Sequence, residues 1–446
     1  MAAALNVTEP TSTGIGGDMF ALYYAAEPRA VAALNGSGRA PAALTLDLIR
    51  SQGLAAGEAL ADPYHAHTVT VPGACAGWCD LIARHGSLPL AEVLAPAIRL
   101  AEEGFPVEPL TSFFWSRSAE RLAKTPGGAV FTLSGRGPRP GEIFRNPGLA
   151  RTLRAVAEGG AGAFYRGEIA RAIARRVQAA GGVLSEADLA AHTSTWEAPL
   201  SVAYRGLRVW ECPPNGQGLP ALLAFNILEG FELAGLDPLS PQRWHLLIEA
   251  LRAAFADARW YVADPAFSPL PLAGLLSAEY AAGRRRLIHP QRATLDIQRG
   301  APVAASGTVY LCAVDGRGNA CSLINSNYMG FGTGLTPEDE AGRSWGFTLQ
   351  NRGHNFSLDP EHPNALKPGK RPYHTIIPGL LTRADGALYG PFGVMGGFMQ
   401  PQGHVQVVLG MADDGLDPQA ALDRPRFCIE DGRAGGSVLL EAGLPA

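Results

Sequence analysis

Apolar residues recur every three or four positions in several stretches, which is the spacing of one face of an amphipathic α-helix. One such stretch covers residues 90–101, and Gly104 with Pro106 should end that helix. The longest covers residues 244–258. A third helix is predicted to begin at Asn146-Pro147, where an Asn cap precedes a Pro in the first turn, and to end at the Gly159-Gly160 pair.

Runs of β-branched and aromatic residues between these helices predict strands. Residues 202–212 predict one hairpin, and residues 309–314 and 320–324 predict another, with a Gly- and Asn-containing turn between them. Residues 31–45 predict a strand, a turn and the start of a further strand. Two more strands are expected near Ile376 and Leu388. Helices interposed between strands predict a fold of the mixed α/β (α+β) class.

Composition and charge narrow the function classes. The 446 residues are 47% hydrophobic and 17% charged, as in a well-cored globular protein. The net charge is −4 and no Lys/Arg cluster occurs, so nucleic acid is not an expected partner. No apolar run approaches the roughly 20 residues of a membrane span. No signal peptide opens the sequence, so neither a membrane nor secretion is expected, and the predicted location is cytoplasmic.

Metal and cofactor signatures are weak. Cys75 and Cys79 lie one helical turn apart, but no second pair or His cluster completes a four-ligand zinc site. The glycines between Gly14 and Gly17 lack the sixth-position glycine of a dinucleotide fingerprint, and a strand follows them where that motif needs a helix. We therefore predict neither a metal nor a cofactor.

Thr308 is the candidate nucleophile. It follows the small residue Gly307 and opens the strand at 309–314. A threonine hydroxyl becomes reactive when a base lies beside it, and a free α-amine on the same residue is such a base. Cleavage between Gly307 and Thr308 would create that amine. From spacing alone, an ordinary strand threonine remains the alternative.

The stretch from Thr308 to Asp315, with Gly318-Asn319-Ala320 behind it, resembles the nucleophile strand of the γ-glutamyltransferase family. Members of that family are N-terminal-nucleophile hydrolases that cut themselves into two subunits. The resemblance implies a four-layer αββα sandwich. It also implies a large subunit of residues 1–307 and a small subunit of residues 308–446, which together form one structural domain. Family members usually carry further elements at both ends, so both termini are expected to be incomplete.

The same resemblance assigns roles to several residues. Ser326 occupies the place of a second hydroxyl that hydrogen-bonds the nucleophile. Gly396-Gly397 occupies the place of an oxyanion hole, for which adjacent glycines can direct two backbone N–H groups at one point. A simple strand-to-helix turn is the other interpretation of this glycine pair.

The substrate-binding positions depart from the γ-glutamyl-specific pattern. Ser37 stands where the family has an arginine for the substrate carboxylate, and Arg39 lies two positions further on. Asn355 stands where an acid holds the substrate ammonium, and a neutral amide supplies no charge there. His374 and Thr375 replace two carboxylate-binding serines.

These departures favour a relative that cleaves a small monocarboxylate amide lacking an α-amine, oxamate among them. The motifs LNGSGRAP, SNYMGFG, QNRG and RPYHTIIP are closer to the oxamate-amidohydrolase-like branch than to the glutathione-degrading one. Two alternatives stay open, namely a true glutathione hydrolase or γ-glutamyl transpeptidase, and an unprocessed, inactive, truncated homologue. Hydrolysis versus transfer and a homo-oligomeric state are also left open.

Overall fold

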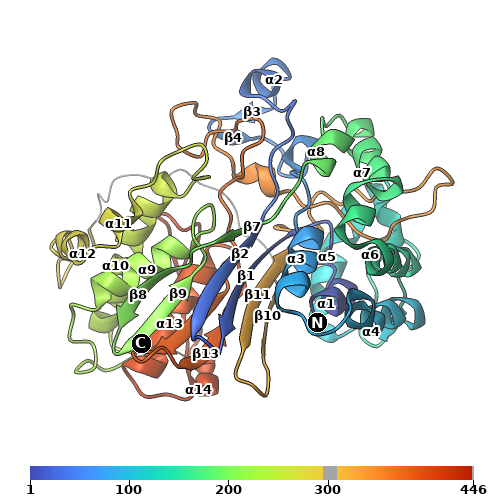
Figure 1. Cartoon of the computed structure of the whole chain (residues 1–446). Helices are drawn as coiled ribbons and strands as arrows, with labels where there is room; N and C mark the ends of the chain where they lie inside the picture. Colours follow the sequence, from blue (N-terminus) through green and yellow to red (C-terminus); the bar gives the residue numbers. More distant parts are fainter. Residues whose placement is uncertain (295–308, 444–446) are drawn as a thin grey trace.

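Two antiparallel sheets form the centre of the computed structural model, which describes residues 1–294 and 309–443 (Figure 1). The five-stranded sheet has the order β10-β11-β1-β2-β7, and the four-stranded sheet has the order β13-β12-β9-β8. The strands of the first sheet are β1 Asp18–Ala25, β2 Ala30–Gly36, β7 Thr195–Glu197, β10 Val309–Val314 and β11 Ala320–Ser326. Those of the second are β8 Leu200–Tyr204, β9 Leu207–Glu211, β12 Gly379–Arg383 and β13 Leu388–Phe392.

Helices cover the outer face of each sheet (Figure 1). Those beside the five-stranded sheet are α1 Ala2–Thr8, α3 Ala74–His85, α4 Leu90–Glu103, α5 Pro109–Lys124, α6 Pro147–Tyr165 and α7 Glu168–Ala179. Those beside the four-stranded sheet are α9 Gly218–Leu228, α10 Pro241–Tyr261, α12 Ala278–Arg285 and α13 Met399–Ala412. The shorter helices are α2 Leu46–Ser51, α8 Glu186–Ala190, α11 Leu272–Leu275 and α14 Pro418–Asp423. Small hairpins pair β3 Ala55–Ala56 with β4 Ala59–Leu60, β5 Phe105–Pro106 with β6 Ile143–Phe144, and β14 Phe427–Ile429 with β15 Val438–Leu440.

The alternation along β1 shows why four layers form. Met19 and Ala21 point to the core shared with the helices, whereas Phe20 and Leu22 point to the core between the two sheets. Successive side chains of a strand face opposite sides of a sheet, so an apolar strand such as β1 is buried on both. The predicted mixed fold and αββα layering are confirmed.

The predicted helices are found, and their caps are as expected. Asn146 Oδ1 accepts a hydrogen bond from the Leu149 N–H at 3.0 Å, and Pro147 begins α6. Gly160, with a φ of 59°, kinks α6 where the sequence predicted its end. The strand start expected near Thr45 is wrong, because the Thr45 hydroxyl instead accepts from the Leu48 N–H at 3.1 Å and caps α2.

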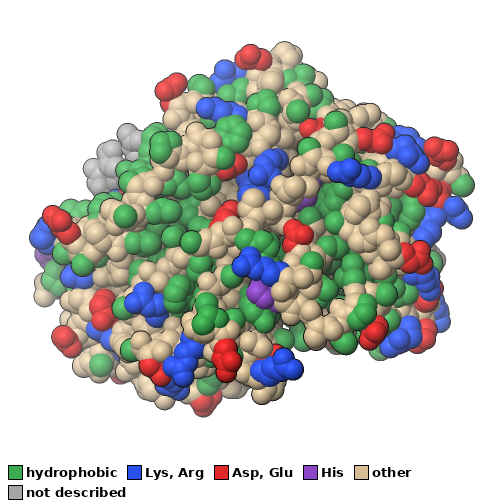
Figure 2. Space-filling view, in the orientation of Figure 1, with side chains coloured by type: hydrophobic (Ala, Val, Ile, Leu, Met, Phe, Trp, Pro, Cys, Tyr) green, Lys and Arg blue, Asp and Glu red, His purple; other side chains and the backbone are tan. Residues whose placement is uncertain are grey.

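The surface carries both signs of charge. Figure 2 shows Lys and Arg side chains interspersed with Asp and Glu over the face that is drawn. Within residues 1–294 and 309–443, no helix is long and apolar enough to cross a bilayer.

Candidate active site

The site is built where strand β10 begins and strand β11 ends. Val309 is the first described residue of β10, and its Cα partner is Asn325 in β11. Ser326 ends β11 and lies directly across from Asp18, the first residue of β1. The predicted cleavage site, Gly307 and Thr308, lies outside the described residues, so the nucleophile stays a prediction.

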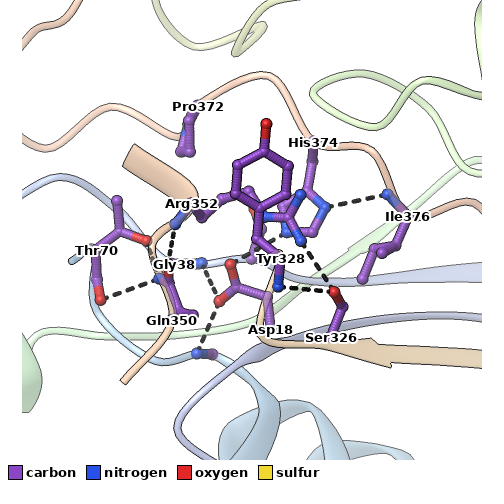
Figure 3. Close-up of polar contacts among 12 residues, drawn as sticks. Asp18, Gly38, Thr70, Ser326, Tyr328, Gln350, Arg352, Pro372, His374 and Ile376 are labelled. Atoms are coloured by element: carbon purple, nitrogen blue, oxygen red, sulfur yellow. Dashed lines mark hydrogen bonds and ion pairs between the residues drawn. The ribbon is translucent and has the colours of Figure 1, made fainter. Parts of the chain in front are cut away.

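Ser326 is fully buried and held by two donors (Figure 3). Its Oγ accepts from the Tyr328 N–H at 2.9 Å and from Arg352 Nη2 at 3.3 Å. Arg352 Nη1 donates to Thr375 Oγ1 at 2.7 Å. The guanidinium carbon lies 4.3 Å from the centre of the Tyr328 ring, within the range of a cation–π contact. One guanidinium therefore joins the predicted residues Ser326 and Thr375.

Arg352 is a buried cation without an ion pair. No carboxylate among the described residues lies within ion-pair distance of it, and its Nε is buried with no hydrogen-bond partner there. Burial lowers the pKa of Arg352 to about 10, and the negative charge of Asp18 opposes that shift. The side chain is therefore positively charged at neutral pH, directly beside the Ser326 hydroxyl.

Asp18 is the buried acid that faces this cation. Its Oδ1 accepts from the Gly38 and Gly73 N–H groups, both at 3.0 Å, and its Oδ2 lies 3.1 Å from His374 Nε2. Burial raises the pKa of Asp18 to about 6, while Arg352 and the two backbone hydrogen bonds act to lower it. Asp18 thus ties three separate segments to the start of β1.

His374 is a neutral positioning group in this arrangement. Its Nδ1 accepts from the Ile376 N–H at 3.4 Å, so the ring proton resides on Nε2 and points to Asp18. Burial, followed by the charges of Arg352 and Arg371, lowers the pKa of His374 well below its usual value. The contact with Asp18 fixes the segment that carries Thr375.

The Gly396-Gly397 turn is connected to the same segment by Gln217. Gln217 Nε2 donates to the Thr375 carbonyl at 2.6 Å and to the Gly397 carbonyl at 2.8 Å. Both glycines have positive φ values, 116° and 60°. Their carbonyls also accept from the first N–H groups of α13. Neither glycine N–H donates to another group among the described residues, so both are available to an oxyanion.

The remaining predicted residues lie further from Ser326. Asn355 Oδ1 accepts from the Tyr328 hydroxyl at 2.7 Å. Tyr328, whose N–H donates to Ser326, therefore links Asn355 to Ser326. Ser37 Oγ is buried and hydrogen-bonds the Asn215 amide. Arg39 donates to the Thr193 carbonyl at 3.4 Å. No hydrogen bond or ion pair within the described chain joins Ser37 or Arg39 to Ser326.

Sequence reasoning missed four residues of the site, namely Asp18, Asn215, Gln217 and Arg352. Asp18 directly follows the Gly16-Gly17 turn that the sequence had singled out, and Asn215 with Gln217 lies in the PPNGQG loop. An acid at the start of a buried strand and amides in a Gly- and Pro-rich loop were available signals. Only the tertiary fold brings them together, because Asp18 and His374 are separated by 356 positions in sequence.

The described part of the chain contains no candidate metal site. No group of three His, Cys, Asp or Glu side chains there could hold a metal ion. The chemistry that the described groups offer is a buried guanidinium, two hydroxyls and two unengaged backbone N–H groups. That combination suits acyl transfer through an oxyanion.

Comparisons with known proteins show which family and which relatives this chain is similar to. The family described as gamma-glutamyltranspeptidase matches residues 1–445. The glutathione hydrolase-like YwrD proenzyme of Bacillus subtilis is 37% identical over 430 residues, which are 96% of this chain and 79% of that protein. The oxamate amidohydrolase proenzyme of Klebsiella pneumoniae is 33% identical over 454 residues, which are 99% of this chain and 82% of that protein. A crystal structure of cephalosporin acylase from Bacillus halodurans matches with a TM-score of 0.89 and 46% identity, covering 100% of this chain and 80% of that one.

Proposed function

The chain belongs to the γ-glutamyltranspeptidase family, and from that premise we propose that it is an autoprocessing amidohydrolase that works through Thr308. The observation that carries the proposal is the position of Ser326. Thr308 is bonded to Val309, and the strand partner of Val309 is Asn325, the neighbour of Ser326. Relatives at 33% and 37% identity carry proenzyme names, which supports processing of one precursor into two parts.

Processing follows from the chemistry of a threonine behind a small residue. Thr308 Oγ attacks the Gly307 carbonyl, and the Gly307–Thr308 C–N bond breaks as the acyl group shifts from nitrogen to oxygen. Water then hydrolyses the ester, which leaves a Gly307 carboxylate and a free Thr308 amine. The products are residues 1–307 and 308–446, the proposed large and small subunits.

Turnover uses the Thr308 hydroxyl again, now with the free Thr308 amine as its base. The free Thr308 amine takes the Oγ proton, and the oxygen attacks the amide carbonyl of the substrate. The Gly396 and Gly397 N–H groups hold the oxyanion. The leaving amine takes the proton and departs, and water or another amine then accepts the acyl group from the Thr308 ester.

Ser326 supports the nucleophile through the direction of its proton. Its oxygen already accepts from the Tyr328 N–H and from Arg352. A hydroxyl with both acceptor positions filled uses its own proton as a donor. We infer that this proton points to Thr308 Oγ and stabilises the negative charge that develops there, with the Arg352 charge behind it.

The substrate class is proposed from the charges around the site. Asn355 carries no charge, and its carbonyl oxygen is already taken by Tyr328, so a substrate ammonium lacks a partner there. We propose a small amide that bears a carboxylate and no α-amine.

The six cysteines are free thiols, which supports a reducing, cytoplasmic location.

Mass spectrometry of the purified protein tests the nucleophile. We expect a fragment that begins Thr308-Val309-Tyr310. Thr308→Ala should abolish both cleavage and amide hydrolysis, because it removes the attacking oxygen, whereas Thr308→Ser should retain part of each. An intact parent chain, or hydrolysis by Thr308→Ala, would contradict the proposal.

A further inference from the structure

A buried carboxylate and a buried imidazole meet between β9 and α13, and neither takes part in the proposed reaction. Glu211 ends β9 and His404 lies on α13. Both side chains are fully buried, and Glu211 Oε1 lies 2.6 Å from His404 Nδ1. Val209, two residues earlier on β9, belongs to the core between the four-stranded sheet and its helices, so Glu211 points to the same side. The polar pair therefore lies in an apolar core.

Little space surrounds the two side chains. A Cβ atom added at Gly218 would lie 2.6 Å from Glu211 Cβ, and one added at Gly379 would lie 3.0 Å from His404 Cε1. The centre of the Phe392 ring lies 4.6 Å from that of His404. Contacts this close hold each side chain in one orientation, because a movement in either direction meets neighbouring atoms.

The pair is a poor source of stability. Glu211 Oε2 and His404 Nε2 are buried without a hydrogen-bond partner among the described residues. A buried polar group left unsatisfied costs about 1–3 kcal/mol. Burial raises the pKa of Glu211, and His404 opposes that shift. Apolar side chains of similar volume often serve a core as well as a buried ion pair does, so stability alone does not account for this contact.

The position of the pair suggests another role, because each partner is close along the chain to a group of the candidate site. Glu211 lies two residues before the PPNGQG loop, which carries Gln217. His404 lies on the helix that begins at Met399, two residues after Gly397. Gln217 Nε2 donates to the Gly397 carbonyl at 2.8 Å. The loop and the helix are thus joined at two separate points, which fixes their relative rotation as well as their distance.

A hydrogen bond restrains this arrangement more tightly than an apolar contact would. Its energy depends on both distance and direction, whereas the hydrophobic effect has no direction. A shift of α13 along the sheet would therefore weaken the bond between Glu211 and His404. The same shift would displace the Gly396 and Gly397 N–H groups, and such donors act only when they lie about 2.7–3.1 Å from the oxyanion.

We propose that Glu211 and His404 are positioning residues that hold α13 in place against β9 and so set the position of the Gly396 and Gly397 N–H groups. The catalytic part of this inference rests on the proposed function. Neither side chain would touch the substrate. Their loss should lower kcat and leave KM nearly unchanged, because the oxyanion exists in the transition state and not in the bound substrate.

A paired apolar replacement separates positioning from stability. Glu211→Leu combined with His404→Leu removes both polar groups and keeps the core filled, so its melting temperature should equal or exceed that of the parent. With oxamate as the substrate, we expect kcat to fall by about tenfold or more. Glu211→Gln can still accept a hydrogen bond from His404 Nδ1 and should keep most of the parent kcat. A folded double variant with the parent kcat would overturn the proposal.

A single substitution keeps the test decisive if the double variant does not fold. Glu211→Met retains the length of the side chain but has no carboxylate to bind His404. We expect the same selective loss of kcat. The parent kcat in Glu211→Met would likewise overturn the proposal.

Hydrogen exchange measured by mass spectrometry tests the geometry without a substrate. We expect residues 393–400 to exchange about tenfold faster in the double variant than in the parent, while α6 exchanges at the same rate in both. The matched control is Gln406→Leu, also on α13, whose amide binds the Phe427 backbone of β14 instead of β9. This control should leave both the exchange of residues 393–400 and kcat unchanged.

The exchange measurement also separates this inference from the proposed function. Faster exchange confined to residues 393–400 supports the positioning role even if the parent hydrolyses no oxamate. Unchanged exchange there overturns the role even if Thr308 proves to be the nucleophile. Faster exchange throughout the chain overturns it as well, because the pair would then stabilise the whole fold and not the oxyanion turn.

Discussion

At the scale of a single residue, Asp18 shows how one buried carboxylate can hold several segments of a site together. It joins the start of β1 to the Gly38 loop, the N-terminus of α3 and His374. Its surroundings favour the neutral acid through burial and the anion through Arg352 and two backbone N–H groups. The net result is a pKa of about 6, above the value of an exposed aspartate.

That shift makes the stability of the fold depend on pH with a definite sign. Between about pH 4 and pH 6 the folded state keeps a proton on Asp18 that the unfolded chain has lost, so the free energy of unfolding falls as the pH rises. The total effect is on the order of 3 kcal/mol, at about 1.4 kcal/mol per pKa unit. Asp18→Asn has no such titration. We expect the melting temperature of the parent, relative to Asp18→Asn, to be higher at pH 4.5 than at pH 7.5.

Scanning calorimetry of the two proteins at both pH values measures this difference. A pH-independent offset between them is expected as well, because the amide changes the contact with His374. A parent that gains stability relative to Asp18→Asn as the pH rises would show that the Arg352 charge dominates over burial.

The roles of the individual site residues stay predictions, but the structure shows how these residues are connected. Ser326 and the Gly396-Gly397 pair were proposed from the family resemblance, and hydrogen bonds tie them to one connected network. Arg352 was not, because an arginine in a loop is usually exposed. Its role depends on burial against Tyr328, which only the packed structure reveals.

At the scale of elements, helix signals were more reliable than loop signals. The caps of α6 and the length of α10 were encoded locally. The strand start expected near Thr45 failed because a threonine followed by an acidic first turn also caps a helix, as it does for α2. Loops that meet in space, such as PPNGQG and the Gly396-Gly397 turn, carry no local signal for each other.

The link between those two loops leads to a prediction for Gln217. Its amide holds the Gly397 carbonyl, and so fixes the residue whose own N–H is proposed to bind the oxyanion. Gln217→Leu removes this bond but keeps both glycine N–H groups. We expect kcat to fall by about tenfold to a hundredfold, less than the loss of an oxyanion donor itself, while KM changes little.

Steady-state kinetics of the purified variant measures the effect. The matched control is Gln178→Leu, which removes a similar amide-to-carbonyl bond, to Leu184, away from the site. A rise in KM with an unchanged kcat would mean that Gln217 acts on substrate binding instead of the oxyanion.

At the scale of the whole molecule, both sheets combine strands from the two sides of the proposed cleavage site. In the five-stranded sheet, β1 pairs with β11, and in the four-stranded sheet, β9 pairs with β12. The core between the sheets likewise mixes Phe20 and Leu22 with Ile324 and Leu380. The layering was predictable from the family resemblance, but this strand pairing needs the tertiary structure, because antiparallel partners can lie anywhere in the sequence.

This interleaving predicts that cleavage does not separate the parts. Residues 1–307 and 308–446 share backbone hydrogen bonds in two sheets, and the hydrophobic cores contain residues of both parts, so separating the parts would leave these cores incomplete. After processing, both fragments should elute together in gel filtration, at the same volume as the uncut 46.8 kDa chain of Thr308→Ala. Separation should require denaturant, since parting them exposes the buried faces of both sheets. Fragments that elute apart in native buffer would show that residues 308–446 form a unit of their own.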